Sequence, residues 1–408
     1  MIALHDALLT YREALVPMPI ERLAPLQAVG RVLAEEVCAA HDLPRYDQSA
    51  MDGYALRAAD TAAATEEQPV ILPVTIRLAA GTTERPNLAA ATAARILTGA
   101  LPPIGADCVM PQEIADIRHN TLHITAPYPA RQNIRHRGEE LHQGATIAPS
   151  GRTITPQLLA ALINAGVAEV AVRRQPSIAV LVSGDEIKPV GSHLEDGEIH
   201  DSNGPMVAAL LASWNLAPNH IEHLPDDADT TRRRLEMALD EHDLVISTGG
   251  ASVGDKDFLP ATAEALGAHR IFWKVAQKPG KPIFFAVRTR PTHRCAMLAL
   301  PGNPGAVLIG MLLHVRTALN VMLGLPKPEP TWRYGRLEKP VDRDERRTRL
   351  LRMRCRFDTD GSSVLVPLGR QDSHMLSNLG YADVLVEVSP GHEAVAAGTV
   401  LPWLALPE

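Results

Sequence analysis

The chain has 408 residues, a formal net charge of −7 and 46% hydrophobic residues. That length exceeds one ordinary hydrophobic core and predicts roughly two to four domains. The net negative charge gives no global electrostatic reason to expect nucleic-acid binding, although a local basic groove stays open.

The N-terminus has no basic start followed by an apolar stretch, so it does not resemble a signal peptide. No run of about 18 apolar residues occurs, so we expect no membrane-spanning helix and a cytoplasmic protein. The four cysteines lie far apart and form no CxxC pair, which favours reduced thiols over a zinc site.

The first half of the chain predicts helices and then a β-rich region. Apolar residues from Leu4 to Leu15 recur at helical spacing, and a second helix is expected over 25–38. Between 68 and 150, short apolar runs alternate with Pro and Gly, which indicates a small β-rich domain. Helical spacing returns from Leu158 and ends at Gly166.

From residue 176 the pattern becomes α/β. Strands are predicted over 177–184 and 243–250, and helices over 203–215, with Asn203 a candidate N-cap, and over 227–242. Residues 296–324 predict a strand, a Pro/Gly turn and a long helix. Strands alternating with helices favour a parallel doubly wound sheet. After a linker at 324–330, short strand-like pieces predict a small all-β domain.

Three motifs in the first half carry candidate site residues. Asp52 in DQSAMDGYALR is either part of a turn or a carboxylate in a cleft. Thr98, before a double proline, lies either in a rigid turn or with its hydroxyl toward a polar ligand. Arg135 and Arg137 are two residues apart, so an extended segment places both on one face, where they suit a phosphate or oxyanion. A solvated charged strand is the alternative for the arginines.

Polar turns follow four predicted strands of the α/β region. These turns contain Asp185 and Glu186; Asp226 and Asp227; Thr248, Gly249 and Gly250, followed by Asp255 and Asp257; and the LPGNPGAV segment with Pro301 and Asn303. Ligands of open parallel sheets collect at the carboxyl ends of the strands, so we expect the four turns to meet at one edge. Glycines let the backbone approach a phosphate, and helix N-termini favour anions. Each turn alone could be only a turn.

Two kinds of charge accompany these turns. Several carboxylates beside a phosphate site suggest a divalent cation, with Mg²⁺ favoured because it binds carboxylates together with substrate oxygens. For each Asp taken singly, helix capping is the alternative. Lys274, Lys278 and Lys281 lie around a Pro-Gly turn and suit a small oxyanion, unless they are exposed solubilising lysines.

Some activities find no support. The chain contains no GxxxxGK[ST] phosphate-binding loop and no HExxH metal motif. None of the 16 histidines is given a catalytic role.

The motifs as a set resemble those of MoeA proteins and the E domain of gephyrin. They are DQSAMDGYA, ILTGALPPIGAD, RHRGEE, GDE, STGGASVGDKDF, KPGKP and LPGNPGA, in the family's order. The resemblance covers about residues 1–405 and implies four domains. These are an elongated domain (1–45 and 140–175), an inserted β-rich domain (46–139), a MogA-like doubly wound α/β domain (176–325) and a C-terminal β-barrel-like domain (326–408). It also implies a homodimer.

The resemblance implies a molybdenum insertase, which combines adenylylated molybdopterin with molybdate to give molybdenum cofactor and AMP. Mg²⁺ would neutralise the phosphates, and cationic side chains would hold the molybdate dianion. Transient contacts with the pterin adenylyltransferase and with molybdoenzymes are implied, and none with nucleic acid or membrane.

Residue roles follow from the resemblance by motif. The implied catalytic residues are Asp52, Thr98, Glu186, Asp226, Asp257 and Lys274, of which Glu186, Asp226 and Asp257 are implied metal ligands. The implied substrate-binding residues are Arg135, Arg137, Thr248, Gly249, Gly250, Lys278, Lys281, Pro301, Asn303, Arg354 and Ser373. Within that set, Lys278, Lys281, Arg354 and Ser373 are implied to form the molybdate pocket.

Three other functions stay open. A receptor-clustering scaffold of the same fold is disfavoured because the acidic and lysine positions are retained. A tungstate insertase cannot be separated by sequence, because the two oxyanions share charge and nearly share size. A standalone pterin adenylyltransferase would need only the α/β domain.

Overall fold

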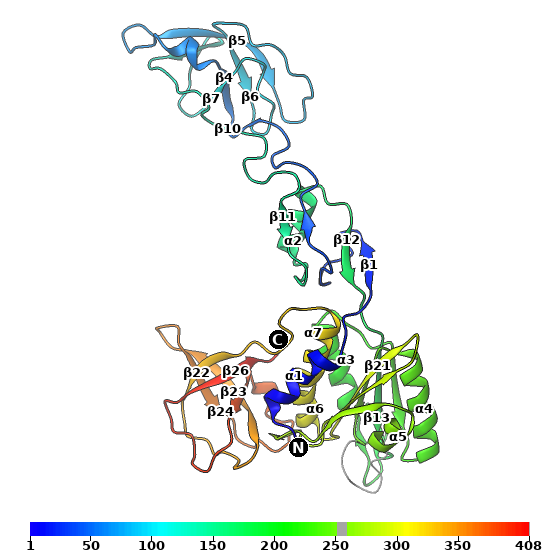
Figure 1. Ribbon diagram of the computed structural model, residues 1–408. Coiled ribbons are helices and arrows are strands. Elements are labelled where there is room, and N and C mark those ends of the chain that lie inside the picture. Colours follow the sequence, from blue (N-terminus) through cyan, green and yellow to red (C-terminus); the bar gives the residue numbers. More distant parts are fainter. Residues whose placement is uncertain (251–258, 408) are drawn as a thin grey trace. The chain divides into compact units, whose positions relative to one another are not determined.

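The computed structural model describes residues 1–250 and 259–407, and the chain forms two compact units (Figure 1). The first unit comprises Met1–Glu21, Gly30–Ala34 and Val172–Glu408, and the second comprises Arg22–Val29 and Glu35–Ala171. Asp257, a predicted metal ligand, lies outside the described residues. The division into four domains stays a prediction.

A six-stranded sheet forms the centre of the first unit. Its strands, in spatial order, are β16 (His220–Leu224), β13 (Ile178–Ser183), β17 (Leu244–Thr248), β21 (Arg294–Leu300), β20 (Phe284–Thr289) and β18 (His269–Trp273). The first four are parallel to one another, as expected, but β20 runs the opposite way and pairs antiparallel with both β21 and β18. The sheet is therefore mixed rather than parallel throughout. Only residues 290–293 join β20 to β21, which is too short for the crossover that a parallel pair needs.

Both faces of this sheet are buried. Alternate residues of β13 point to opposite faces: Ile178, Val180 and Val182 join one core, and Ala179 and Leu181 join another. The first face packs against α1 (Leu4–Ala14), α3 (Asn203–Ser213) and a continuous helical stretch of α6 (Pro304–Gly310), a π-helical turn (Met311–Val315) and α7 (Arg316–Met322). The second packs against α4 (Ala228–Glu241) and α5 (Leu259–Ala265). The N-terminal helix α1 matches its prediction and lies beside α7 (Figure 1).

The stretch Pro304–Met322 is the one helix within residues 1–250 and 259–407 that is long and apolar enough to cross a membrane. Its most apolar part is 94% buried inside the protein. A core helix has that property, so the stretch is weak evidence for a membrane span.

The C-terminal segment forms a closed β-barrel sheet around a core that includes Leu351, Leu365, Val386 and Trp403. Its strands, in spatial order, are β19 (Gln277–Lys278), β23 (Thr348–Phe357), β24 (Ser363–Pro367), β22 (Arg333–Leu337), β26 (Val400–Ala405) and β25 (Val384–Val388), and β23 also pairs with β25. Strand β19 lies in sequence between two strands of the α/β sheet. The α/β and barrel parts therefore meet where the lysine-containing turn begins.

The second unit is mainly β-structure, as predicted for 68–150. Its six-stranded sheet has the order β7 (Cys108–Pro111), β4 (Gly53–Leu56), β6 (Ala93–Ile96), β5 (Val70–Leu78), β9 (Thr121–Ile124) and β8 (Asp116–Arg118). Two short antiparallel pairs join β3 (Gln48–Ser49) to β10 (Ile134–Arg135), and β2 (Val37–Cys38) to β11 (Thr146–Ala148). The unit's helix is α2 (Pro156–Asn164), capped by the Thr155 hydroxyl.

The predicted helix over 25–38 is wrong. Residues 25–30 form turns, and Val37 and Cys38 form β2. Gly30 adopts a left-handed backbone conformation with φ of 81°, which ends any continuous helix there. The remaining short elements are β1 (Ile20–Leu23), β12 (Val170–Arg173), β14 (Ile187–Lys188), β15 (Ile199–His200) and the 3₁₀ turns Ala58–Thr61 and Leu379–Tyr381.

Candidate active site

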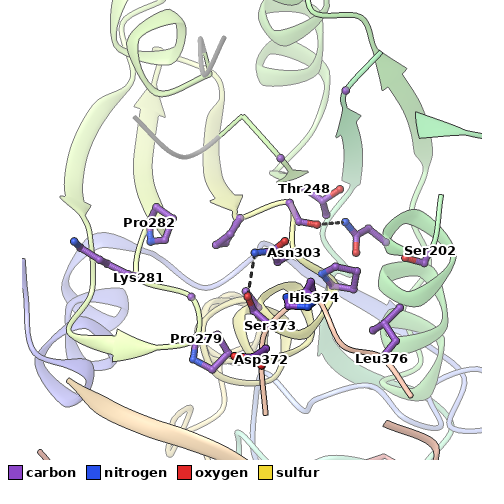
Figure 2. Close-up of a pocket in the computed structure, with 18 of the residues that line it drawn as sticks. Ser202, Thr248, Pro279, Lys281, Pro282, Asn303, Asp372, Ser373, His374 and Leu376 are labelled. Atoms are coloured by element: carbon purple, nitrogen blue, oxygen red, sulfur yellow. Dashed lines mark hydrogen bonds between the residues drawn. The ribbon is translucent and has the colours of Figure 1, made fainter. Parts of the chain in front are cut away.

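A pocket of about 1060 Å³ lies where the carboxyl ends of the parallel strands face the barrel. Three groups of residues line it: the turns after the strands, the turn from Gln277 to Pro282, and the barrel segments 347–351 and 371–376. Figure 2 shows side chains from all three groups around one space, among them Thr248, Lys281 and Ser373. This volume lies just above the range of about 300–1,000 Å³ that is usual for small-molecule sites.

The four predicted strand ends do meet in this pocket. Its lining includes Glu186 after β13, Asp226 after β16, Thr248, Gly249 and Gly250 after β17, and Pro301 and Asn303 after β21. Gly249 has a φ of 88°, and a Cβ there would lie 2.7 Å from the Ser183 carbonyl oxygen. A side chain at 249 would therefore disrupt the meeting of two of these turns.

Two buried polar side chains in the lining have an atom without a hydrogen-bond partner among the described residues. They are Thr248, at its Oγ1, and Asn203, at its Oδ1. Asn203 does not cap helix α3, since it is the first helical residue and its Nδ2 donates to the Gly302 carbonyl over 2.8 Å. Buried polar groups usually have partners, so these two atoms indicate a polar ligand in the pocket.

The acidic residues divide by role. Glu186 and Asp226 line the pocket, whereas Asp227 caps α4 by accepting from the Thr230 amide over 2.7 Å. The Thr230 side chain and amide hold the pKa of Asp227 below its usual value. Within the described part of the chain, no group of three or more His, Cys, Asp or Glu side chains forms a metal site.

The three predicted lysines differ in whether they line the pocket. Lys278 and Lys281 line the pocket, but Lys274 does not, and its ammonium lies 4.9 Å from the centre of the Trp273 ring. Lys278 Nζ is 3.9 Å from Oδ2 of Asp344, a carboxylate that Arg347 contacts more closely, over 2.7 Å. The Arg347 guanidinium is the main reason that the pKa of Asp344 falls to about 2. Lys281 has no ion pair among the described residues, so it is the less neutralised of the two cations.

Ser373 reaches the pocket on a barrel loop that is held through both its backbone and its side chain. Its Oγ accepts a 3.0 Å hydrogen bond from Asn303 Nδ2 (Figure 2). Its carbonyl accepts a 2.8 Å bond from the Gly305 amide. A Cβ at Gly305 would lie 2.8 Å from that carbonyl oxygen. The start of α6 therefore fixes the position of Ser373.

Arg354 is not brought to the pocket. It is exposed on β23 and is absent from the lining residues. Arg352, two residues earlier, is 2% exposed and donates to the backbone carbonyls of Arg370, Asp372 and Met375 over 3.0–3.3 Å. Arg352 thus holds the loop that carries Ser373, and sequence analysis missed it.

In the second unit, Asp52 and Thr98 contact one another. Oδ1 of Asp52 accepts from the Thr98 amide over 2.7 Å and from the Thr98 hydroxyl over 2.8 Å. The amide bond, followed by the hydroxyl bond, lowers the pKa of Asp52. The carboxylate is therefore held ionised in a fixed orientation.

The two predicted arginines of the second unit differ in their partners. Arg135 is exposed on β10, opposite Gln48 of β3. Arg137 follows that strand, and its Nε donates to Oδ2 of Asp42 over 2.5 Å while its amide donates to Asp47. The charge of Arg137 is thus largely matched by Asp42.

Three comparisons with known proteins agree with one another. Family models match residues 2–166 (MoeA N-terminal region, domains I and II), 179–321 (Probable molybdopterin binding domain) and 334–406 (MoeA C-terminal region, domain IV). The molybdopterin molybdenumtransferase of Staphylococcus aureus strain Mu50 is 33% identical over 381 residues, 93% of this chain and 90% of that protein. The protein of the same name from Staphylococcus epidermidis is 32% identical over 375 residues, 92% of this chain and 88% of that protein.

Solved structures extend this likeness to the fold. Two structures of the molybdopterin biosynthesis MoeA protein of Pyrococcus horikoshii superpose with TM-scores of 0.81 and 0.82, at 27% and 25% identity. They cover 99% and 100% of both chains. The fold is the multidomain MoeA arrangement with a MogA-like α/β domain and a C-terminal barrel. The chain belongs to the molybdopterin molybdenumtransferase (MoeA) family.

Proposed function

We propose that this protein is a molybdenum insertase that transfers molybdenum from molybdate into adenylylated molybdopterin, with release of AMP. The observation that carries the proposal is the pocket itself. It joins four polar strand ends of the region that matches the molybdopterin-binding model to a two-lysine turn and a serine of the C-terminal barrel. Relatives along nearly the whole chain carry the corresponding transferase name.

Molybdate would bind beside the lysine turn. Lys278 and Lys281 would supply positive charge for the dianion, and Ser373 with Asn303 would supply hydrogen bonds to its oxygens. The protein's main task is to hold two anions that repel each other at reacting distance. Cations at a partly enclosed site are suited to that task because screening by water is reduced there.

The pterin would occupy the strand ends. Thr248 Oγ1 and Asn203 Oδ1 offer one hydroxyl and one amide acceptor to the ring, and both are buried lining atoms without a partner among the described residues. Gly249, Gly250 and Pro301 would allow the backbone to approach the phosphates. Hydrogen bonds from the ring to Thr248 Oγ1 and Asn203 Oδ1 would remove a cost of roughly 1–3 kcal/mol for each buried group that lacks a partner.

The donor chemistry of the pocket fits Mg²⁺. Glu186 and Asp226 line it, Mg²⁺ takes one or two carboxylates plus substrate phosphate oxygens, and we propose Asp257 as a third ligand. When bound, the cation would neutralise charge on the phosphoanhydride as AMP leaves.

We also propose that Asp52, Thr98, Arg135, Arg137 and Lys274 contribute to catalysis or substrate binding. We further propose a cytoplasmic homodimer that receives pterin from the adenylyltransferase and passes cofactor to molybdoenzymes.

The proposal is tested by mixing the purified protein with adenylylated molybdopterin, with and without Mg²⁺, and with molybdate, tungstate or neither. We expect AMP release that depends on both the metal and molybdate, together with cofactor that activates an apo-molybdoenzyme. Equal AMP release without any oxyanion would contradict insertion. Activity with tungstate but not with molybdate would identify the protein as a tungsten insertase. Light scattering on the same sample tests whether the protein is a dimer.

A further inference from the structure

A buried histidine lies in the π-helical turn that interrupts the long core helix. His314 is fully buried, and the turn Met311–Val315 separates α6 from α7. Such turns are rare and recur at functional sites. Because nothing in the proposed reaction uses His314, its contacts call for a separate explanation.

His314 is the middle of a chain of three hydrogen bonds that ends at the lysine turn. Tyr11 Oη lies 3.1 Å from His314 Nδ1, and His314 Nε2 lies 2.8 Å from Gln277 Oε1. Gln277 Nε2 then donates to the Pro279 carbonyl over 3.2 Å. Tyr11 and Gln277 are themselves fully buried, and Phe272 and Phe285 pack against the Tyr11 ring.

The Pro279 carbonyl fixes which atom donates and which accepts in each of these hydrogen bonds. A carbonyl oxygen only accepts, so the Gln277 amide must turn its nitrogen toward Pro279 and its oxygen toward His314. His314 must then carry its proton on Nε2, and its bare Nδ1 accepts from the Tyr11 hydroxyl. Burial lowers the pKa of His314 to about 3, which keeps the ring neutral.

The lysine turn is built closely around the Gln277 amide. Gly280 has a φ of 95°, and a Cβ there would lie only 2.5 Å from Gln277 Nε2. The Val275 amide donates to the Lys281 carbonyl over 2.9 Å and closes the turn. On its other side, β19 pairs Gln277 with Thr348 and Lys278 with Arg349 of the barrel. The amide therefore sits at the base of the segment that presents both lysines to the pocket.

We propose that Gln277, oriented by His314 and Tyr11, is a positioning residue that sets the two-lysine turn for the oxyanion. The inference rests on the proposed function for its substrate. It assigns to the hydrogen-bonded core of the first unit a defined part in oxyanion binding, carried by Tyr11 and His314 outside the pocket lining and by Gln277 within it.

The test compares Gln277→Met with Thr317→Val in the full-length protein. Methionine matches the length of glutamine but removes both hydrogen bonds. Thr317 is a buried residue of α7 whose hydroxyl donates to the Leu313 carbonyl and makes no bond to the lysine turn, so its loss is a control for general destabilisation. Melting temperatures of the two variants show whether they are equally destabilised. Tyr11→Phe removes only the hydrogen bond between Tyr11 and His314 and leaves the two bonds of Gln277 in place.

Three readouts are combined. We expect Gln277→Met to raise the KM for molybdate by about tenfold while kcat stays within about twofold, since of the two lost bonds the one to the Pro279 carbonyl holds the turn, and one such bond corresponds to roughly that factor. Amide hydrogen exchange over residues 276–284 should accelerate in Gln277→Met and not in Thr317→Val. Nitrogen NMR of the wild type should show His314 protonated on Nε2 alone, and Tyr11→Phe should give a smaller rise in KM.

The proposal is overturned if Gln277→Met matches Thr317→Val in both exchange and KM, or if His314 carries its proton on Nδ1. Faster exchange with an unchanged KM also overturns it, because the turn would then not be positioned for the oxyanion. If the wild type shows no molybdate-dependent activity, the proposed function fails. In that case the exchange and NMR readouts still decide whether Gln277 positions the turn.

Discussion

Asn303 donates a 3.0 Å hydrogen bond to the Oγ of Ser373, which joins the turn after β21 to the barrel loop in the wall of the pocket. We expect Asn303→Ala and Ser373→Ala each to weaken molybdate binding, with little loss of stability because both side chains reach solvent. A double-mutant cycle should give a coupling energy of about 0.5–1.5 kcal/mol in molybdate binding. Strictly additive effects in titration calorimetry would show that the bond has no part in the site.

The two lysines of the turn should contribute unequally. Lys281→Ala should raise the KM for molybdate by about tenfold, because it removes a cation near the dianion that forms no ion pair within residues 1–250 and 259–407. Lys278→Ala should have a smaller effect, since Asp344 already lies 3.9 Å from that ammonium. The exposed Lys339→Ala, outside the pocket, is the matched control. The reverse order of the two variants would place the oxyanion elsewhere on the turn.

Arg352 and Arg354 offer a sharp contrast on one strand. Arg352→Met should lower the free energy of unfolding by about 2–4 kcal/mol, because three carbonyls lose a charged donor and the loop with Ser373 is released. Arg354→Met should leave both stability and molybdate KM near wild type, as expected for an exposed residue. Denaturant unfolding and steady-state kinetics measure the two effects. A large kinetic defect in Arg354→Met alone would restore Arg354 as the site arginine.

The bonds from Thr98 to Asp52 predict a pH dependence of stability. They lower the pKa of Asp52 in the folded state, so their stabilisation is present above the ordinary value of 3.8 and is lost as pH falls through the lowered pKa. Thr98→Val keeps the amide bond but removes the hydroxyl bond. Carbon NMR of the Asp52 carboxyl should show its titration moving to higher pH in Thr98→Val. An unmoved titration would mean that the amide bond alone sets the pKa.

The sequence predicts the part of the site that depends on regular patterns. Apolar strands such as β13 and β17, each followed by a polar turn, lead to one sheet edge whatever the details of packing. The positions of Glu186, Asp226 and Thr248 at the ends of their strands are therefore enough to predict that they lie together, and all three line the pocket.

The rest depends on contacts between distant segments. Arg352 and Arg354 are two residues apart and look alike in an alternating pattern, and only the loop at 370–375 decides which one is buried. Asn203 resembles a helix cap in the sequence, whereas in the fold its amide donates to Gly302. The π-helical turn at His314 has no periodic signal at all. A histidine directly after the apolar run from Ala306 to Leu313, as at His314, is the one hint that the sequence offers.

The central claim is that the pocket beside the lysine turn is where molybdate binds. Anomalous diffraction at the molybdenum edge from crystals soaked in molybdate tests it most directly. We expect a peak bounded by Lys278, Lys281 and Ser373, and its loss in Lys281→Ala crystals of the same form. A peak found only outside the pocket, or one that is unchanged in Lys281→Ala, would contradict the account.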